Sequence, residues 1–318
     1  MDFSNILDFA RVSRDRVSEE GIGGVAKSAR DVHESALRHG VSRVYWPEGT
    51  PVFEEDWDVL LVLDACRADL LAAVRDEYEF LDAPDTRLSV DSTSHRWMEK
   101  NFSAAYADDL RETAYVTGNP YSDGVLAERE FRLLDEVWKY AWDDDLGTIH
   151  PRPLTDRAIA VGRDLDPGRL IVHYMQPHYP FVRHREVDDG IPLAFFREGV
   201  TDTDRERDVW SQFKEGELTE SEVRELYLDN LRYVLDDVGL LLANLDAETV
   251  VISADHGNAF GEFGVYGHPP GMPFRSVREV PWYATSATDT GEYVPETEPP
   301  DSESNGTVDE RLRDLGYL

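Results

Sequence analysis

The chain of 318 residues is 41% hydrophobic, which is enough for one large α/β domain, or two small ones, with a real core. Its formal net charge of −33 argues against binding of nucleic acid through a basic face. A mean hydropathy of −0.49 and the lack of any long uncharged apolar run argue against a transmembrane helix.

Acidic residues are spread along the whole chain, which contains only four lysines, at positions 27, 100, 139 and 214. We interpret this acidic, lysine-poor composition as a halophilic trait, because molar salt shortens the Debye length to about 3 Å and screens the self-repulsion. An acidic interaction surface is the alternative interpretation. The first residues lack the basic start and apolar core of a signal peptide, so we expect a cytoplasmic protein.

Residues 1–50 carry apolar positions at helical spacing, interrupted by the glycines of residues 21–24. This pattern predicts an N-terminal helical extension, either an additional layer on the main domain or an oligomerisation element. We place the main domain at residues 51–290 and an acidic mobile tail with a short final helix at residues 291–318. The oligomeric state stays open.

An unbroken apolar run from Val59 to Leu63 predicts a strand buried on both faces, and it ends in Asp64. A carboxylate at the carboxyl end of a parallel strand lies where open α/β sheets bind ligands. Capping of the helix that follows is the alternative for Asp64. Cys66 is the single cysteine, which excludes an intramolecular disulfide, and we interpret it as a small buried residue rather than a reactive thiol.

Three hydroxyl residues, at positions 92–94, precede a helical pattern that includes Trp97 and Met98. The amides at a helix N-terminus stabilise an anion, and a hydroxyl beside a metal can act as a nucleophile. The alternative is a simple helix N-cap. Further along, residues 113–117 predict a strand that enters a turn at Asn119, which either lines a site or only forms the turn.

Aromatic spacing predicts a helix over residues 126–142, and a second helix is predicted over residues 154–164. Residues 170–175 then form another buried-strand pattern. We interpret His173, inside this strand, as a packed core residue. His178 follows the strand between two prolines, which hold it stiffly.

The charged connection at residues 183–220 is long enough for a lid or a substrate-binding segment, and residues 221–245 predict a long amphipathic helix. A short β-branched strand at residues 249–252 then leads to Asp255 and His256, with His268 further on. Carboxylates and imidazoles at two strand ends predict a site for a divalent metal.

In the order in which they occur, these motifs resemble those of the sulfatases within the alkaline phosphatase superfamily. The resemblance covers roughly residues 56–290 and the end of the chain. The matching segments are Asp64-Ala-Cys-Arg-Ala-Asp69, His173-Tyr-Met-Gln-Pro-His-Tyr-Pro-Phe181, Asp255-His-Gly-Asn-Ala-Phe-Gly-Glu-Phe-Gly264, Gly267-His268 before Val280-Pro281, and Glu310-Arg-Leu-Arg-Asp-Leu-Gly-Tyr317.

The resemblance implies an α/β fold with a mostly parallel sheet and helices on both faces. It also implies one divalent metal ion (Ca, Mg, Mn or Zn), held by Asp64, Asp255 and His256, with Ser94 as fourth ligand and nucleophile. His178 and His268 would be catalytic, as contacts to the transferred group or as acids. Ser92, Arg96 and Asn119 would contact the substrate, a sulfate or phosphate ester of a small molecule or glycan.

Several alternatives stay open. Ser92 and Arg96 have the spacing of the formylglycine sulfatases, whose motif is Cys or Ser followed by x-Pro-x-Arg, but Ser94 replaces the proline, so we do not expect the modification. Ser92 is the second choice for the nucleophile, and a second ion between His178 and His268 is an alternative to a single metal. The chain could also be a phosphoethanolamine- or phosphoglycerol-type transferase, or an inactive sulfatase-like scaffold.

Overall fold

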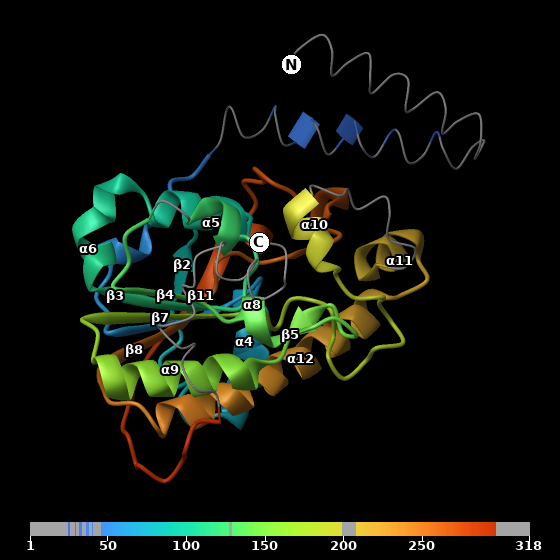
Figure 1. Ribbon diagram of the computed structural model, residues 1–318. Helices are drawn as coiled ribbons and strands as arrows, with labels where there is room; N and C mark the ends of the chain where they lie inside the picture. Colours follow the sequence, from blue (N-terminus) through green and yellow to red (C-terminus); the bar gives the residue numbers. More distant parts are fainter. Residues whose placement is uncertain are drawn as a thin grey trace, which may run out of the picture.

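A seven-stranded sheet, in the order β2-β11-β8-β1-β7-β3-β4, organises the part of the chain that the computed structural model describes (Figure 1). That part comprises residues 46–126, 129–198 and 208–296, with single positions between 25 and 40. Most neighbours in the sheet run parallel, and β11 pairs antiparallel with both β8 and β2 at one edge. The strands are β1 (Val59–Leu63), β2 (Thr86–Leu88), β3 (Thr113–Thr117), β4 (Leu133–Glu136), β7 (Arg169–Tyr174), β8 (Ala247–Ser253) and β11 (Glu279–Ala287).

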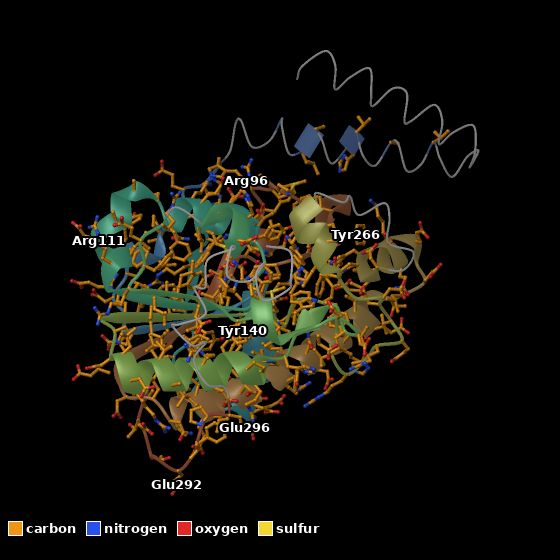
Figure 2. The ribbon with its side chains drawn as sticks, viewed as in Figure 1. Arg96, Arg111, Tyr140, Tyr266, Glu292 and Glu296 are labelled. Carbon is orange, nitrogen blue, oxygen red and sulfur yellow. The ribbon has the colours of Figure 1, made fainter. Side chains whose placement is uncertain are left out.

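Helices cover both faces of the sheet, so the predicted α/β class is confirmed (Figure 1). One face packs on α4 (Ala68–Val74), α9 (Pro151–Leu165) and α12 (Glu220–Leu242), and the other on α5 (Ser94–Asn101) and α6 (Ala107–Glu112). Side chains fill the space between the sheet and these layers (Figure 2). Successive residues of β1 enter opposite cores, and none is more than 4% exposed, which explains its unbroken apolar run.

Four predicted strands, at residues 59–63, 113–117, 170–175 and 249–252, correspond to β1, β3, β7 and β8. The long helix predicted at residues 221–245 is α12, which begins with a capping box between Thr219 and Glu222. Within the predicted connection at residues 183–220 lie two short helices, α10 (Leu193–Glu198) and α11 (Val209–Glu215). Among the described residues, no helix combines the length and the apolar character that a membrane crossing requires.

The helix predicted over residues 126–142 is wrong. Its sequence forms β4, followed by the single turn α8 (Trp138–Ala141), after the short α7 (Ser122–Val125). Pairing with β3 overrides the helical spacing, because it makes β4 the edge strand of the sheet. Asp135 of β4 also forms a buried ion pair with Arg157, in which Arg157 Nε lies 2.5 Å from Asp135 Oδ2. Helical periodicity alone does not include such a tertiary pairing.

The remaining short elements lie in the connections. They are η2 (Val52–Glu54), η3 (Arg75–Glu77), η4 (Ala104–Tyr106), β5 (Trp142–Asp143), β6 (Thr148–Ile149), β9 (Ala259–Phe260), η6 (Glu262–Gly264), β10 (Tyr266–Gly267) and α13 (Arg275–Arg278). The division into an extension (1–50), a main domain (51–290) and a tail (291–318) stays a prediction. Most residues before 46, and residues 297–318, lie outside the described part of the chain.

Candidate metal and nucleophile site

The carboxyl ends of β1, β7 and β8 lie side by side, because these strands are parallel neighbours in the sheet. Asp64 follows β1, and Asp255 and His256 follow β8 within three residues of its end. Open α/β sheets bind ligands at this edge. The structure therefore brings together the residues that the sequence predicted as metal ligands, and each of the three is at most 2% exposed.

The Asp64 carboxylate is held from two sides. Its Oδ2 atom accepts a hydrogen bond from Asn119 Nδ2 at 2.8 Å and lies 3.4 Å from the hydroxyl of Ser94. Its Oδ1 atom has no hydrogen-bond partner among the described residues. Burial, and then the negative charge of Asp255, raise the pKa of Asp64 well above its ordinary value, so the site disfavours two bare carboxylates.

Only one of the two oxygens of the Asp255 carboxylate has hydrogen-bond partners among the described residues. Its Oδ1 atom accepts hydrogen bonds from the backbone amides of Ala65 at 3.0 Å and His256 at 2.9 Å. Its Oδ2 atom is buried without a partner in the described part of the chain. Ala65 has a left-handed backbone conformation, with φ of 59°, which turns its amide toward Asp255 directly after β1.

Hydrogen bonding determines the tautomer of His256. Its Nδ1 atom contacts the carbonyl oxygen of Gly257 at 2.9 Å, and a carbonyl can only accept, so Nδ1 carries the proton and Nε2 the lone pair. Nε2 lies 3.4 Å from Asp255 Oδ2, 3.7 Å from Asp64 Oδ1 and 3.3 Å from Ser94 Oγ. Burial lowers the pKa of His256 to about 3, so the ring is neutral at pH 7.

These donor atoms fit a divalent metal ion. A lone pair that faces two buried carboxylate oxygens is unfavourable unless a cation lies between them. Ligands at zinc distances of about 2.0–2.2 Å stand roughly 3.4 Å apart in a tetrahedron, close to the separations around His256 Nε2. A metal-bound imidazole commonly donates its other N–H to a backbone carbonyl, as His256 does to Gly257.

His173 also belongs to this cluster, although its sequence context predicted only a packed core residue. One ligand atom each from Asp64, His173 and Asp255 lies within 4.8 Å of the others. The ring is fully buried, and burial lowers its pKa to about 4. A polar residue inside an otherwise apolar strand was the only sequence signal that pointed to it.

Ser94 and Ser92 have different surroundings. Ser94 is the first residue of α5, and its hydroxyl faces Asp64 and His256. The Ser92 hydroxyl instead donates to the Pro269 carbonyl at 3.1 Å. It also accepts from the amides of residues 271 and 272, at 3.0 and 3.3 Å. Ser92 thus holds the loop after His268, and Ser94 faces the predicted metal ligands.

Asn119 and Arg96, the other two residues predicted to contact substrate, have different surroundings. The side-chain amide nitrogen of Asn119 donates a hydrogen bond to Asp64, and its Oδ1 atom accepts one from the backbone amide of Tyr121 at 3.0 Å. Asn119 therefore orients the Asp64 carboxylate. The side chain of Arg96 is 52% exposed, lies 3.9 Å from Asp91, and lines a cavity beside the site. Asn119 therefore supports Asp64, while Arg96 faces the open space.

His178 and His268 contact each other, Nε2 to Nε2 at 3.0 Å, and the His268 ring stacks on His256 with ring centroids 4.3 Å apart. His178 Nδ1 contacts the Tyr179 carbonyl and must donate to it. In the neutral pair, His268 therefore donates from Nε2 to His178. The lone pair of His268 then lies on Nδ1, which has no hydrogen-bond partner among the described residues.

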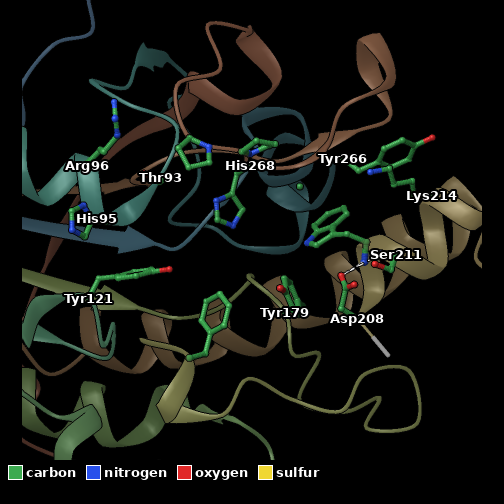
Figure 3. Close-up of a pocket in the computed structure, with 15 residues that line it drawn as sticks. Thr93, His95, Arg96, Tyr121, Tyr179, Asp208, Ser211, Lys214, Tyr266 and His268 are labelled. Atoms are coloured by element: carbon green, nitrogen blue, oxygen red, sulfur yellow. Dashed lines mark hydrogen bonds between the residues drawn. The ribbon is translucent and has the colours of Figure 1, made fainter. Parts of the chain in front are cut away.

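A cavity of about 590 Å³ opens beside His268. Figure 3 shows His95, Arg96 and Tyr121 on one side of His268, with Ser211 and Lys214 on the other. The second side comes from α11, within the connection predicted as a lid or substrate-binding segment. The lining residues are Thr93, His95, Arg96, Tyr121, Tyr179, Phe195, Asp208, Trp210, Ser211, Lys214, Tyr266, Gly267, His268, Pro269 and Pro270.

Comparison with known proteins gives matches among solved structures. No family model and no curated protein sequence matches the chain. The soluble domain of lipooligosaccharide phosphoethanolamine transferase A from Neisseria meningitidis is 13% identical, with 71% of this chain and 75% of that chain covered and a TM-score of 0.46. The C-terminal periplasmic domain of a phosphoethanolamine transferase from Campylobacter jejuni is 16% identical, with 81% of each chain covered and a TM-score of 0.41.

A 2-O GAG sulfatase is 14% identical, with a TM-score of 0.45. The match covers 73% of this chain and 64% of the sulfatase. Sulfatases and phosphoethanolamine transferases are thus among the solved structures to which this chain is similar.

Proposed function

We propose that this protein is a metal-dependent hydrolase or transferase that acts on a sulfate or phosphate ester through Ser94. One observation carries the proposal: the lone pair of His256 Nε2 faces two buried carboxylate oxygens and the Ser94 hydroxyl. Asp64, Asp255 and His256 would hold the metal, with Ser94 beside it. The bound ion would neutralise the carboxylates, lower the pKa of the hydroxyl and polarise the ester oxygens.

In the first step, Ser94 Oγ forms a bond to sulfur or phosphorus, and the bond to the alcohol oxygen breaks. The hydroxyl proton passes to Asp64 Oδ2, which lies 3.4 Å away. The N-terminus of α5 carries a partial positive charge where Ser94 enters the helix, which favours the negative charge that develops. The leaving oxygen takes this proton from Asp64, so the products of this step are a covalent seryl ester and the released alcohol.

In the second step, His268 acts as the base. Its Nδ1 lone pair is unpartnered within the described residues, and burial lowers its pKa well below the ordinary value, so the ring is neutral at pH 7. Nδ1 takes the proton of a water molecule as the water oxygen forms a bond to sulfur or phosphorus and the bond to Ser94 Oγ breaks. The proton then passes from Nδ1 to Oγ, which restores the serine hydroxyl. An alcohol in the same position makes the enzyme a transferase. His178 holds the ring through the hydrogen bond at 3.0 Å.

The cavity supports an ester whose alcohol carries a ring. Its walls include Tyr121, Tyr179, Trp210 and Tyr266, and flat aromatic side chains stack on sugar or aromatic rings. Arg96 and Lys214 also line it, against the single acidic side chain of Asp208. In a chain with a net charge of −33, this local excess of positive charge favours an anionic substrate.

The test is turnover of an aryl sulfate and an aryl phosphate, measured together with metal content, for the unchanged protein, Ser94→Ala and Asp255→Ala. We expect one bound metal, turnover of one ester class, and loss of turnover in both variants. The preferred ester decides between sulfate and phosphate. Unchanged turnover in Ser94→Ala would refute the nucleophile, and a protein that neither binds metal nor turns over ester would leave the scaffold alternative.

A further inference from the structure

His173 lies fully buried in β7, and its Nε2 atom has no hydrogen-bond partner among the described residues. The nearest charged atom is Asp255 Oδ2, which also lacks a partner and lies 3.7 Å away, too far for a hydrogen bond. Buried polar atoms almost always have partners. Two of them facing each other at this separation indicate that something binds between them.

The other nitrogen of His173 is held firmly. Nδ1 lies 2.8 Å from the hydroxyl of Tyr115, a fully buried side chain on the adjacent strand β3. The ring also packs edge-on against Trp97 of α5, with centroids 5.7 Å apart. The imidazole is thus fixed by Trp97 and by the phenol, with Nε2 toward Asp255 and Asp64.

We propose that His173 is a further ligand of the metal through Nε2, and that Tyr115 is the positioning residue that accepts the Nδ1 proton in a hydrogen bond. This inference rests on the proposed metal site. A ligand distance of about 2.1 Å allows one ion to contact two atoms that stand 3.7 Å apart. The arrangement matches the common one in which a metal-bound imidazole donates its other N–H to a second group.

A second imidazole changes which metal the site selects. Asp64, His173 and Asp255 form one group of possible ligands, and His256 Nε2 lies 3.4 Å from Asp255 Oδ2. If His173 binds the ion together with the three expected ligands, the protein supplies two nitrogen and two carboxylate ligands. Calcium and magnesium prefer oxygen ligands, whereas zinc and other first-row transition metals bind imidazole well. We therefore infer that a transition metal, with zinc favoured, is the resident ion rather than calcium or magnesium.

The experiment is titration of chelator-stripped protein with Zn²⁺ and with Co²⁺, and the readouts are affinity and the visible spectrum of bound cobalt. The variants are His173→Ala and Tyr115→Phe. Tyr174→Phe is the matched control, because Tyr174 is also fully buried but its hydroxyl bonds Thr155, on the opposite face of the sheet. Asp255→Ala shows the effect of losing an expected ligand.

We expect His173→Ala to weaken zinc binding about 100-fold and to change the cobalt spectrum, which reports the nitrogen ligands. Tyr115→Phe should weaken zinc binding about tenfold, the usual effect of a lost outer hydrogen bond, and Tyr174→Phe should have no effect. Binding of Ca²⁺ or Mg²⁺ should be much weaker than that of Zn²⁺. Tighter binding of Ca²⁺ or Mg²⁺ than of Zn²⁺ would overturn the inferred metal preference.

The outcomes separate this inference from the proposed function. If the unchanged protein binds none of these metals, the proposed function fails together with the inference. If the unchanged protein and His173→Ala bind zinc equally and give the same cobalt spectrum, only the role of His173 is overturned. Should His173→Ala not fold, an unchanged affinity in Tyr115→Phe overturns the inference.

Discussion

Ser94 Oγ lies 3.3 Å from His256 Nε2, so a hydroxyl from the start of α5 meets an imidazole that follows β8, 162 residues further along the chain. The Ser94 hydroxyl can donate to only one neighbour at a time, and both of its neighbours, His256 Nε2 and Asp64 Oδ2, are acceptors. Two buried acceptors around one hydroxyl support the proposal that Ser94 loses its proton and acts as the nucleophile.

Replacement of Ser94 by alanine should therefore lower kcat by at least about 1000-fold, because no other described hydroxyl is placed between Asp64 and His256. Ser92→Ala is the matched control. It removes the hydrogen bonds to the loop at residues 269–272, so it should cost about 1–3 kcal/mol of stability and leave the chemical step intact. Kinetics with an aryl ester, and mass spectrometry of a trapped seryl ester, distinguish the two positions.

Replacement of Asp255 by asparagine should have opposite effects with and without metal. In chelator, the variant should be more stable, because it removes the repulsion between Asp64 and Asp255 and can donate an N–H to His256 Nε2. With zinc, it should be less stable than the unchanged protein, because a ligand is lost. Urea denaturation in EDTA and in zinc measures both, and equal destabilisation in the two conditions would contradict a metal role for Asp255.

The stability of the metal-free protein should depend on pH through the buried histidines. Burial lowers the pKa of His173 to about 4 and that of His256 to about 3, whereas the unfolded chain binds these protons near pH 6.5. The unfolding free energy therefore decreases as the pH falls from about 6.5 to 4, by up to about 1.4 kcal/mol per pH unit for each histidine.

His173→Gln should reduce the slope of the unfolding free energy against pH by about the contribution of one histidine. Comparison of two proteins cancels the opposite contribution of Asp64, whose pKa is raised by burial and by Asp255, so that it favours the folded state at low pH. The measurement is urea denaturation in chelator between about pH 4.5 and 7. Identical pH slopes for the unchanged protein and the variant would show that His173 is protonated equally in both states.

Replacement of Trp210 by alanine should raise KM about tenfold for a ring-bearing ester and change kcat little, because the indole lines the cavity rather than the reacting centre. The indole Nε1 atom is buried without a hydrogen-bond partner among the described residues. Trp210→Phe removes this atom but keeps an aromatic ring, so it should raise KM by less than Trp210→Ala.

Charge reversal at Lys214 should also raise KM, most strongly at low salt, because this residue contributes to the positive wall of the cavity. Lys139→Glu is the control, since Lys139 lies outside the cavity lining and pairs with Asp123 and Glu136. Equal effects of the two reversals would indicate a general charge effect and not substrate contact.

Salt should stabilise the whole protein. With a net charge of −33, self-repulsion extends over about 30 Å at 0.01 M salt and over about 3 Å at 1 M. We expect the melting temperature to rise steadily with KCl up to molar concentrations. A melting temperature that stays constant across this range would refute the predicted adaptation to high salt.

The sequence by itself determined the central strands and two acidic strand ends. Strand β1 is apolar along its whole length, and β3, β7 and β8 each contain a shorter apolar run, at residues 114–116, 170–172 and 250–252. A strand that is buried on both faces accounts for such runs. The carboxyl ends of parallel strands meet at one edge, so Asp64 and Asp255 could be assigned to one site before the structure was known. The motifs around them also identified His256.

Tertiary structure decided the rest. The segment at residues 126–142 has helical spacing, and only its pairing with β3 makes part of it the edge strand β4. Ser92 and Ser94 are two residues apart, so the path of the chain into α5 decides which hydroxyl reaches Asp64. His173 has the same local pattern whether it packs in a core or faces a metal, and only strand register places its two nitrogens between Tyr115 and Asp255.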